Sequence, residues 1–303
     1  MAKNDKSDFM TTLSDTMANA VEKASTTTVL VNGRKRLPAS GIIMQADLIL
    51  TADHVVEREE DIQVAFPDGS QQVSQIVGRD PGSDLAILRL PESVPTRAEP
   101  VSQEPRVGQL VLALGRPTLD GIQASLGVIS AVGGPVRTGR GSLLMRYLRT
   151  DAIPYPGFSG GPLINTEGSV VGINTSGLAR GASLAIPASL AWKIGSILSE
   201  HGSLRRGYLG VRSQPVSISS AQQKALGRDQ AVGLLLVNVE AGSPAEVGGL
   251  IVGDILTSVD NHPINDHDDL LVLLSGDLVG KPTPIEVLRG GEPRIITVTI
   301  GEH

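Results

Sequence analysis

The sequence predicts a mainly β protein made of two domains. Its 303 residues are about twice the usual domain length of roughly 150 residues. The 35 Gly and 19 Pro residues separate short apolar runs, a pattern typical of strands joined by turns. Hydrophobic residues make up 40% of the chain and charged residues 19%, which indicates a folded globular protein. Many short, evenly spaced strands indicate a sandwich or a barrel.

Charge and cysteine content exclude several classes of function. Lys and Arg total 26 and Asp and Glu total 32, a formal net charge of −6, so the chain as a whole does not attract nucleic acid or anionic lipid. It contains no cysteine, which excludes disulfides, thiol catalysis and Cys-ligated zinc. We therefore expect no nucleic-acid partner, no metal and no cofactor.

The first domain is expected to span residues 1–203. Apolar residues recur at spacings of three and four over residues 7–24, which predicts an amphipathic helix. A second helix is predicted at 189–200, with Gly202 beyond its end. Between the helices, short apolar runs predict strands at 28–31, 41–50, 62–66, 85–90, 109–114, 123–131, 143–149 and 169–174.

The second domain is expected to span residues 204–303, because the polar, Gly-containing segment 201–207 is typical of a linker. One helix is predicted at 266–275, where acidic residues open the first turn and Gly276 follows the end. Strands are predicted at 208–213, 233–239, 254–259, 283–289 and 295–300.

The segment Gly157–Leu163, with the sequence GFSGGPL, predicts a nucleophilic serine. Glycines on both sides of Ser159 allow a tight turn that exposes the hydroxyl. They also let backbone N–H groups converge on one point, as an oxyanion hole requires. A serine hydroxyl is a weak nucleophile at neutral pH and needs a general base.

The chain offers one well-placed base among its five histidines. His54 follows an apolar strand, whereas the others lie in the linker, in the second domain or at the C-terminus. Asp84 opens another apolar strand and could fix the tautomer of the imidazole. Each residue alone has a structural explanation, but the three together predict a catalytic triad of His54, Asp84 and Ser159.

These motifs resemble those of the HtrA family of trypsin-like serine proteases. Leu48–Val56 resembles the His motif of that family, Ser83–Leu88 its Asp motif, and Thr150–Ala152 with Gly157–Leu163 its Ser motif. The order His, Asp, Ser is that of chymotrypsin. The resemblance implies a chymotrypsin-like double β-barrel protease domain followed by one PDZ domain of the α+β class.

The second domain resembles the PDZ domain of the same family in residues 233–256. PDZ domains bind the C-terminus of a peptide as an added strand. The matching carboxylate-binding loop is Arg206–Gly210. The peptide-binding residues implied by this match are Tyr208, Leu209 and Gly210 in the loop and Leu270, Leu271 and Leu274 on the helix. Some of these leucines could equally be ordinary core residues.

The resemblance implies endoproteolysis of unfolded or damaged proteins, as in protein quality control. Ser159 would attack the scissile carbonyl, His54 would carry the proton, and Asp84 would orient His54. The backbone N–H groups of Gly157 and Ser159 would form the oxyanion hole. The loop at 174–184 is mostly small or aliphatic, which implies a small or medium apolar P1 side chain.

The oxyanion loop departs from the family pattern at two aromatic residues. Phe158 and Tyr155 stand where the family usually has Asn. Phe158 could reorient the loop, narrow the S1 pocket or simply pack against the barrel. A second hypothesis is therefore a latent or inactive protease that acts as a peptide-binding or chaperone-like protein. Arg116 also replaces a family Asn, without an evident function.

The family resemblance implies a homo-oligomer, and a trimer is expected. Its other expected partners are unfolded polypeptides and, at the PDZ domain, hydrophobic C-terminal peptides. The first 29 residues contain no apolar signal segment, and no membrane anchor is predicted. The sequence as written is therefore expected to be cytoplasmic, or extracytoplasmic if a leader has been removed.

Overall fold

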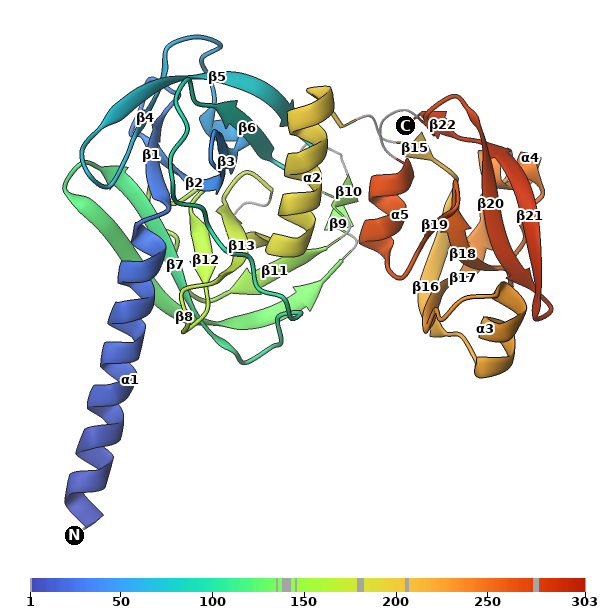
Figure 1. Cartoon of the computed structure of the whole chain (residues 1–303), viewed down its shortest axis with the longest axis horizontal. Coiled ribbons are helices and arrows are strands. Elements are labelled where there is room, and N and C mark those ends of the chain that lie inside the picture. Colours follow the sequence, from blue (N-terminus) through green and yellow to red (C-terminus); the bar gives the residue numbers. More distant parts are fainter. Residues whose placement is uncertain are drawn as a thin grey trace. The chain divides into compact units, whose positions relative to one another are not determined.

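The computed structural model describes residues 2–134, 136–137, 143–144, 146–178, 183–204, 207–274 and 278–302. The chain divides into two compact units, Met1–Ser203 and Leu204–His303 (Figure 1). Each unit has its own hydrophobic core, and the two are described separately below.

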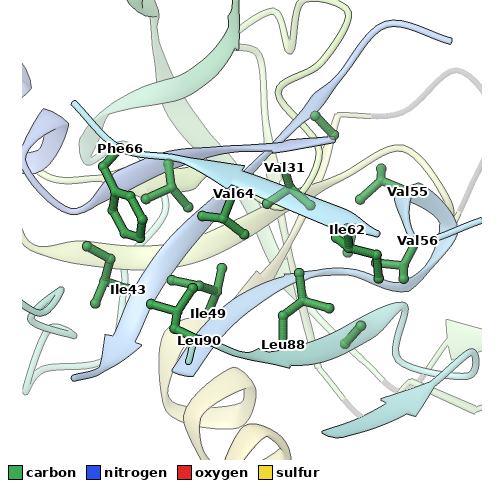
Figure 2. Close-up of a cluster of buried hydrophobic side chains, with 14 residues drawn as sticks. Val31, Ile43, Ile49, Val55, Val56, Ile62, Val64, Phe66, Leu88 and Leu90 are labelled. Atoms are coloured by element: carbon green, nitrogen blue, oxygen red, sulfur yellow. The ribbon is translucent and has the colours of Figure 1, made fainter. Parts of the chain in front are cut away.

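The first unit begins with a closed six-stranded barrel in the order β1-β2-β3-β6-β5-β4. Its strands are β1 (Thr28–Asn32), β2 (Ala39–Gln45), β3 (Leu48–Ala52), β4 (Ile62–Ala65), β5 (Gln71–Asp80) and β6 (Leu85–Arg89). Aliphatic side chains fill the interior together with Phe66, as Figure 2 shows. The low aromatic content of the chain is therefore no obstacle to a packed core, because branched residues on the pleated strands interdigitate.

A second closed barrel follows, in the order β11-β14-β13-β12-β7-β8. Its strands are β7 (Leu110–Thr118), β8 (Gly121–Gly133), β11 (Tyr147–Thr150), β12 (Pro162–Ile164), β13 (Val170–Thr175) and β14 (Leu184–Pro187). A short ribbon pairs β9 (Val136–Arg137) with β10 (Leu143–Leu144). The predicted double β-barrel is thus confirmed.

Helices flank the barrels. Helix α1 (Ala2–Ser25) packs its C-terminal turns against the second barrel through Ala20 and Ala24, while its N-terminal part extends away from the barrels (Figure 1). Helix α2 (Ala188–His201) ends at Gly202, which has a φ of +77°, a left-handed conformation that glycine adopts without strain. The 3₁₀ helix η1 (Asp53–Val55) follows β3.

The second unit is a six-stranded antiparallel sheet, in which five strands follow the order β16-β17-β18-β20-β21 and β19 pairs with β18, with helices packed against it. The strands are β16 (Val211–Ser217), β17 (Val232–Val239), β18 (Ile255–Val259), β20 (Pro282–Arg289) and β21 (Glu292–Thr299); β19 (His262–Pro263) pairs with β18, and β15 (Gly207–Tyr208) pairs with β22 (Gly301–Glu302). The helices are α3 (Ser220–Leu226), α4 (Pro244–Gly248) and α5 (His267–Leu274). Strand β16 is at the edge of the main sheet, where an extended peptide could add.

Candidate active site

Pairing of β3 with β6 brings His54 and Asp84 together. Ala52 at the end of β3 lies opposite Leu85 at the start of β6, so the residues beyond these ends are neighbours. The His54 backbone N–H donates to Asp84 Oδ1 at 2.9 Å, and His54 Nδ1 lies 2.7 Å from Asp84 Oδ2. An ionised carboxylate only accepts hydrogen bonds, so in the neutral imidazole the proton resides on Nδ1 and Nε2 carries the lone pair that can accept a proton.

Asp84 is 1% exposed and is held on its other side by β13. Thr175 Oγ1 donates to Asp84 Oδ2, and the Gly177 N–H donates to Thr175 Oγ1 at 3.0 Å. A Cβ at Gly177 would lie 2.5 Å from Asp84 Oδ2 and 2.8 Å from His54 Nδ1. Only glycine therefore fits beside the two residues.

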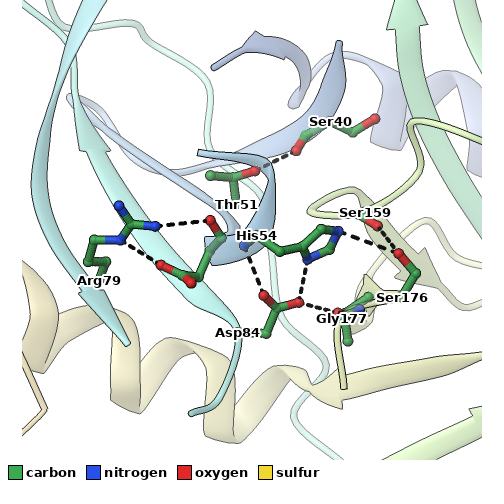
Figure 3. A network of polar contacts seen from close by, with 10 residues as sticks. Ser40, Thr51, His54, Arg79, Asp84, Ser159, Ser176 and Gly177 are labelled. Atoms are coloured by element: carbon green, nitrogen blue, oxygen red, sulfur yellow. Dashed lines mark hydrogen bonds and ion pairs between the residues drawn. The ribbon is translucent and has the colours of Figure 1, made fainter. Parts of the chain in front are cut away.

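The turn that carries His54 is fixed from behind by Arg79. Its Nε donates to Asp53 Oδ1 at 2.6 Å (Figure 3), and its Nη2 donates to the Val56 carbonyl at 3.1 Å. Asp53 is 1% exposed, so the guanidinium compensates a buried charge. The Asp53 backbone N–H also donates to the Asp84 carbonyl at 3.0 Å, which connects η1 to the start of β6.

Ser159 follows a type II turn. The Phe158 N–H donates to the Tyr155 carbonyl at 3.0 Å, and Gly157 has a φ of +91°. Pro156 and Gly157 occupy the two central positions that this turn type favours. Within the described part of the chain, the N–H groups of Gly157 and Ser159 donate to no protein acceptor, so both are available to a bound oxyanion.

Ser40 on β2 holds this loop, a role that the sequence did not reveal. Its N–H donates to the Ser159 carbonyl at 3.1 Å, and its hydroxyl donates to the Gly157 carbonyl at 2.7 Å. The Arg116 N–H donates to the same hydroxyl at 2.8 Å. Ser40 is fully buried, so the first barrel supports the nucleophile loop of the second.

Arg116 has a structural role. Its side chain donates to the Thr28 carbonyl at 2.8 Å and to the Ser25 carbonyl at 3.2 Å, so it binds the chain where α1 ends and β1 begins. A cation at a helix C-terminus is favourable. Burial lowers the pKa of the Arg116 guanidinium below its ordinary value.

Phe158 packs into the interior of the second barrel. Its side chain is fully buried in a cluster with Val111, Ile129 and Leu163, and its ring meets that of Tyr155 edge to face at 5.5 Å. Of the three possibilities considered for Phe158, packing is the one observed. Residues 179–182 of the loop at 174–184, from which the P1 preference was predicted, lie outside the described part of the chain.

Ser176 lies between the predicted nucleophile Ser159 and the predicted base His54, which the sequence did not anticipate. Ser159 Oγ lies 3.1 Å from Ser176 Oγ, and Ser176 Oγ lies 3.4 Å from His54 Nε2 (Figure 3). In the described part of the chain, Ser159 and His54 share no direct hydrogen bond. The three predicted triad residues therefore come together, but with a fourth side chain among them.

The predicted peptide-binding residues of the second unit fall into two groups. Leu209, Leu270 and Leu274 are 2%, 7% and 7% exposed and belong to the core cluster, so little of their surface remains to line a groove. Tyr208 and Leu271 are half-buried, and Gly210 has a φ of +77°. The Tyr208 hydroxyl donates to Glu240 Oε2, which raises the pKa of Tyr208. Arg206 lies outside the described residues.

The fold defines a class: a trypsin-like peptidase domain built of two β-barrels, followed by a PDZ domain. The sequence-family model of the trypsin-like peptidase domain matches residues 39–173, and that of the PDZ domain matches residues 207–300. The chain is 31% identical to the solved HtrA-type protease AlgW with tripeptide, with a TM-score of 0.65 over 95% of this chain and 97% of that one. The serine endoprotease from Yersinia pestis is also 31% identical, with a TM-score of 0.59 over 95% and 98%.

The chain belongs to the HtrA family, which confirms the resemblance seen in the sequence. Curated relatives include proteins named probable periplasmic serine endoprotease DegP-like. The one from Halomonas elongata is 35% identical over 89% of this chain and 57% of the relative; the one from Ectopseudomonas mendocina is 37% identical over 86% and 56%. The chain thus spans a little over half the length of these relatives.

The expected cytoplasmic location is wrong. The curated relatives are named as periplasmic proteins, which points to a location outside the cytoplasm. The expectation rested on the lack of an apolar signal segment in the first 29 residues and of a predicted membrane anchor. Among the described residues, no helix is both long and apolar enough to cross a membrane.

Proposed function

We propose that this chain is a serine endopeptidase that cleaves unfolded or damaged polypeptides. The observation that carries the proposal is the hydrogen bond of the half-buried His54 to the buried Asp84 beside Ser159, with the N–H groups of Gly157 and Ser159 available next to the nucleophile. A hydrolase of this kind needs a nucleophile, a base, an orienting group and an oxyanion hole, and the residues present can supply all four.

The reaction would proceed through an acyl-enzyme. Ser159 Oγ attacks the scissile carbonyl carbon while His54 Nε2 takes the hydroxyl proton, and Asp84 stabilises the resulting imidazolium. The two backbone N–H groups stabilise the oxyanion, a contribution worth about 10²–10³ in rate per donor. His54 then gives its proton to the leaving amine, and water releases the acyl group by the same steps in reverse order.

The second unit would bind hydrophobic C-terminal peptides from substrates or regulators. The strand β16 is at the edge of the main sheet, so an extended peptide could add to it, and the half-buried Tyr208 and Leu271 keep part of their surface exposed for contact. The similar AlgW structure contains a tripeptide. We propose that the protein acts outside the cytoplasm and forms a homotrimer. The exposed Phe9 and Met10 on α1 offer apolar surface for assembly.

Cleavage of a permanently unfolded protein tests the proposal. The wild type should digest a reduced, alkylated substrate and spare the same protein when it is folded, because an extended chain is needed to enter the site. Ser159→Ala should abolish cleavage and keep the same circular dichroism spectrum. Full cleavage by Ser159→Ala would disprove the assignment of the nucleophile.

The second candidate is a protease that is latent until triggered and otherwise acts as a peptide-binding, chaperone-like protein. The observation in its favour is the position of Ser159, which bonds to Ser176 rather than to His54. If so, the Ser159→Ala variant would suppress the aggregation of an unfolded protein as well as the wild type does. Addition of a hydrophobic C-terminal peptide would switch cleavage on in the wild type alone.

A further inference from the structure

We infer that Ser176 is a positioning residue that holds Ser159 in a resting state, hydrogen-bonded away from its base. The inference rests on the proposed serine endopeptidase and refines how that site is regulated. In the resting state the Ser159 proton lies on the hydrogen bond to Ser176, and cleavage requires it to move to His54.

The direction of each hydrogen bond follows from the donors present. In the neutral imidazole that can act as a base, His54 Nδ1 donates to Asp84 and Nε2 therefore accepts. Ser176 therefore donates its proton to Nε2 over 3.4 Å, and its oxygen accepts the proton of Ser159 over 3.1 Å. A hydroxyl carries one proton, so a Ser159 that donates to Ser176 cannot donate to His54.

The residues on either side hold Ser176 in this place. Thr175 points inward to Asp84, and its oxygen also accepts the Gly177 N–H. Gly177 packs so closely on the His54–Asp84 pair that no Cβ fits. Between two fixed neighbours, the Ser176 side chain faces the opposite way, toward the nucleophile. It is exposed, so a substrate entering the site can displace it.

The distances favour a competing partner over a proton relay. A relay would pass the Ser159 proton through Ser176 to His54 and would need two short, aligned bonds at once. The contact between Ser176 Oγ and His54 Nε2, at 3.4 Å, is longer than the usual range of about 2.5–3.0 Å for an O–H donor. A neutral hydrogen bond such as the one between Ser159 and Ser176 contributes about 0.5–1.5 kcal/mol net. Its removal should therefore raise the population of the direct Ser159–His54 pair by about 2- to 10-fold.

The rate of labelling by a small fluorophosphonate tests the inference on the full chain. This probe reacts with an activated serine and occupies little of the substrate cleft. We expect Ser176→Ala to react about 2- to 10-fold faster than the wild type, and Ser176→Thr, which keeps a hydroxyl, to react at the wild-type rate. Ser70→Ala removes an exposed hydroxyl that bonds only locally to Asp68 and serves as the matched control.

The outcomes separate this inference from the proposed function. Labelling of the wild type with an equal or slower rate for Ser176→Ala would overturn the resting-state role and leave the endopeptidase intact. A slower rate in Ser176→Ala that Ser176→Thr restores would instead indicate the relay. If neither protein reacts at Ser159, the proposed function fails and the resting-state role fails with it.

Discussion

Ser40→Ala should lower both the stability and the turnover of the protein, because one buried hydroxyl joins the two barrels at the nucleophile loop. The substitution removes the donor to the Gly157 carbonyl and the acceptor of the Arg116 N–H. Each buried backbone group left without a partner costs about 1–3 kcal/mol. The free energy of unfolding should therefore fall by about 2–6 kcal/mol.

The effect on turnover distinguishes this residue from an ordinary buried serine. The Gly157 carbonyl belongs to the loop that presents the oxyanion donors, and complete loss of one such donor costs about 10²–10³ in kcat. A loosened loop should cost less, about 10- to 100-fold, with KM nearly unchanged. Unfolding in guanidinium and kcat on an unfolded substrate, at a temperature where the variant is folded, measure the two effects.

Ser74→Ala is the matched control for Ser40→Ala. Ser74 is 2% exposed, lies in the same barrel and donates to the Ile62 carbonyl at 2.9 Å, away from the site. It should lose about 1–3 kcal/mol of stability and keep its kcat. An unchanged kcat in Ser40→Ala, beside a loss of stability, would refute the claim that Ser40 positions the oxyanion loop.

Three further outcomes are expected. Gly177→Ala should lower kcat by about 10²-fold or more, because its Cβ would lie 2.5 Å from Asp84 Oδ2; peptide hydrolysis measures this, and near-wild-type activity would contradict the packing described. Burial raises the pKa of Glu286, but hydrogen bonds from Arg228, Thr257 and Ser258 outweigh it and hold the pKa below that of an ordinary glutamate. Its stabilisation is therefore complete above about pH 4.5 and disappears as the pH falls through the lower folded-state pKa; calorimetry should show the wild-type advantage over Glu286→Gln shrinking in acid, and a constant difference would refute it. Deleting residues 207–303 should leave some cleavage of unfolded protein, measured by gel, since the triad lies wholly in the first unit; complete loss of cleavage in a folded product would show that the second unit is required.

The regular elements with strong apolar runs were predictable from the sequence. Helix α2 and its glycine end, and strands such as β6 and β13, lie within a residue or two of the ranges expected. Strand β5 was missed because its sequence, QQVSQIVGRD, alternates polar and apolar residues irregularly and is half-exposed. Its identity as a strand depends on pairing with both β4 and β6.

The candidate triad was predictable from the sequence because each of its members lies in a local motif close to a strand. Ser40 and Ser176 were not, because each acts through contacts with residues far away in the chain: 117 positions separate Ser40 from Gly157, and 122 separate Ser176 from His54. A serine in a strand or after one carries no signal of such a role. The burial of Phe158 likewise depends on a slot beside Gly115, where a Cβ would lie 2.4 Å from the ring.

Intact-mass analysis after fluorophosphonate treatment tests the central claim most directly. If Ser159 is an activated nucleophile beside the His54–Asp84 pair, the wild type should gain the mass of one adduct, located at Ser159 by peptide mapping. Ser159→Ala should gain none. An adduct at another residue, or none on the wild type even with a hydrophobic C-terminal peptide present, would contradict the account.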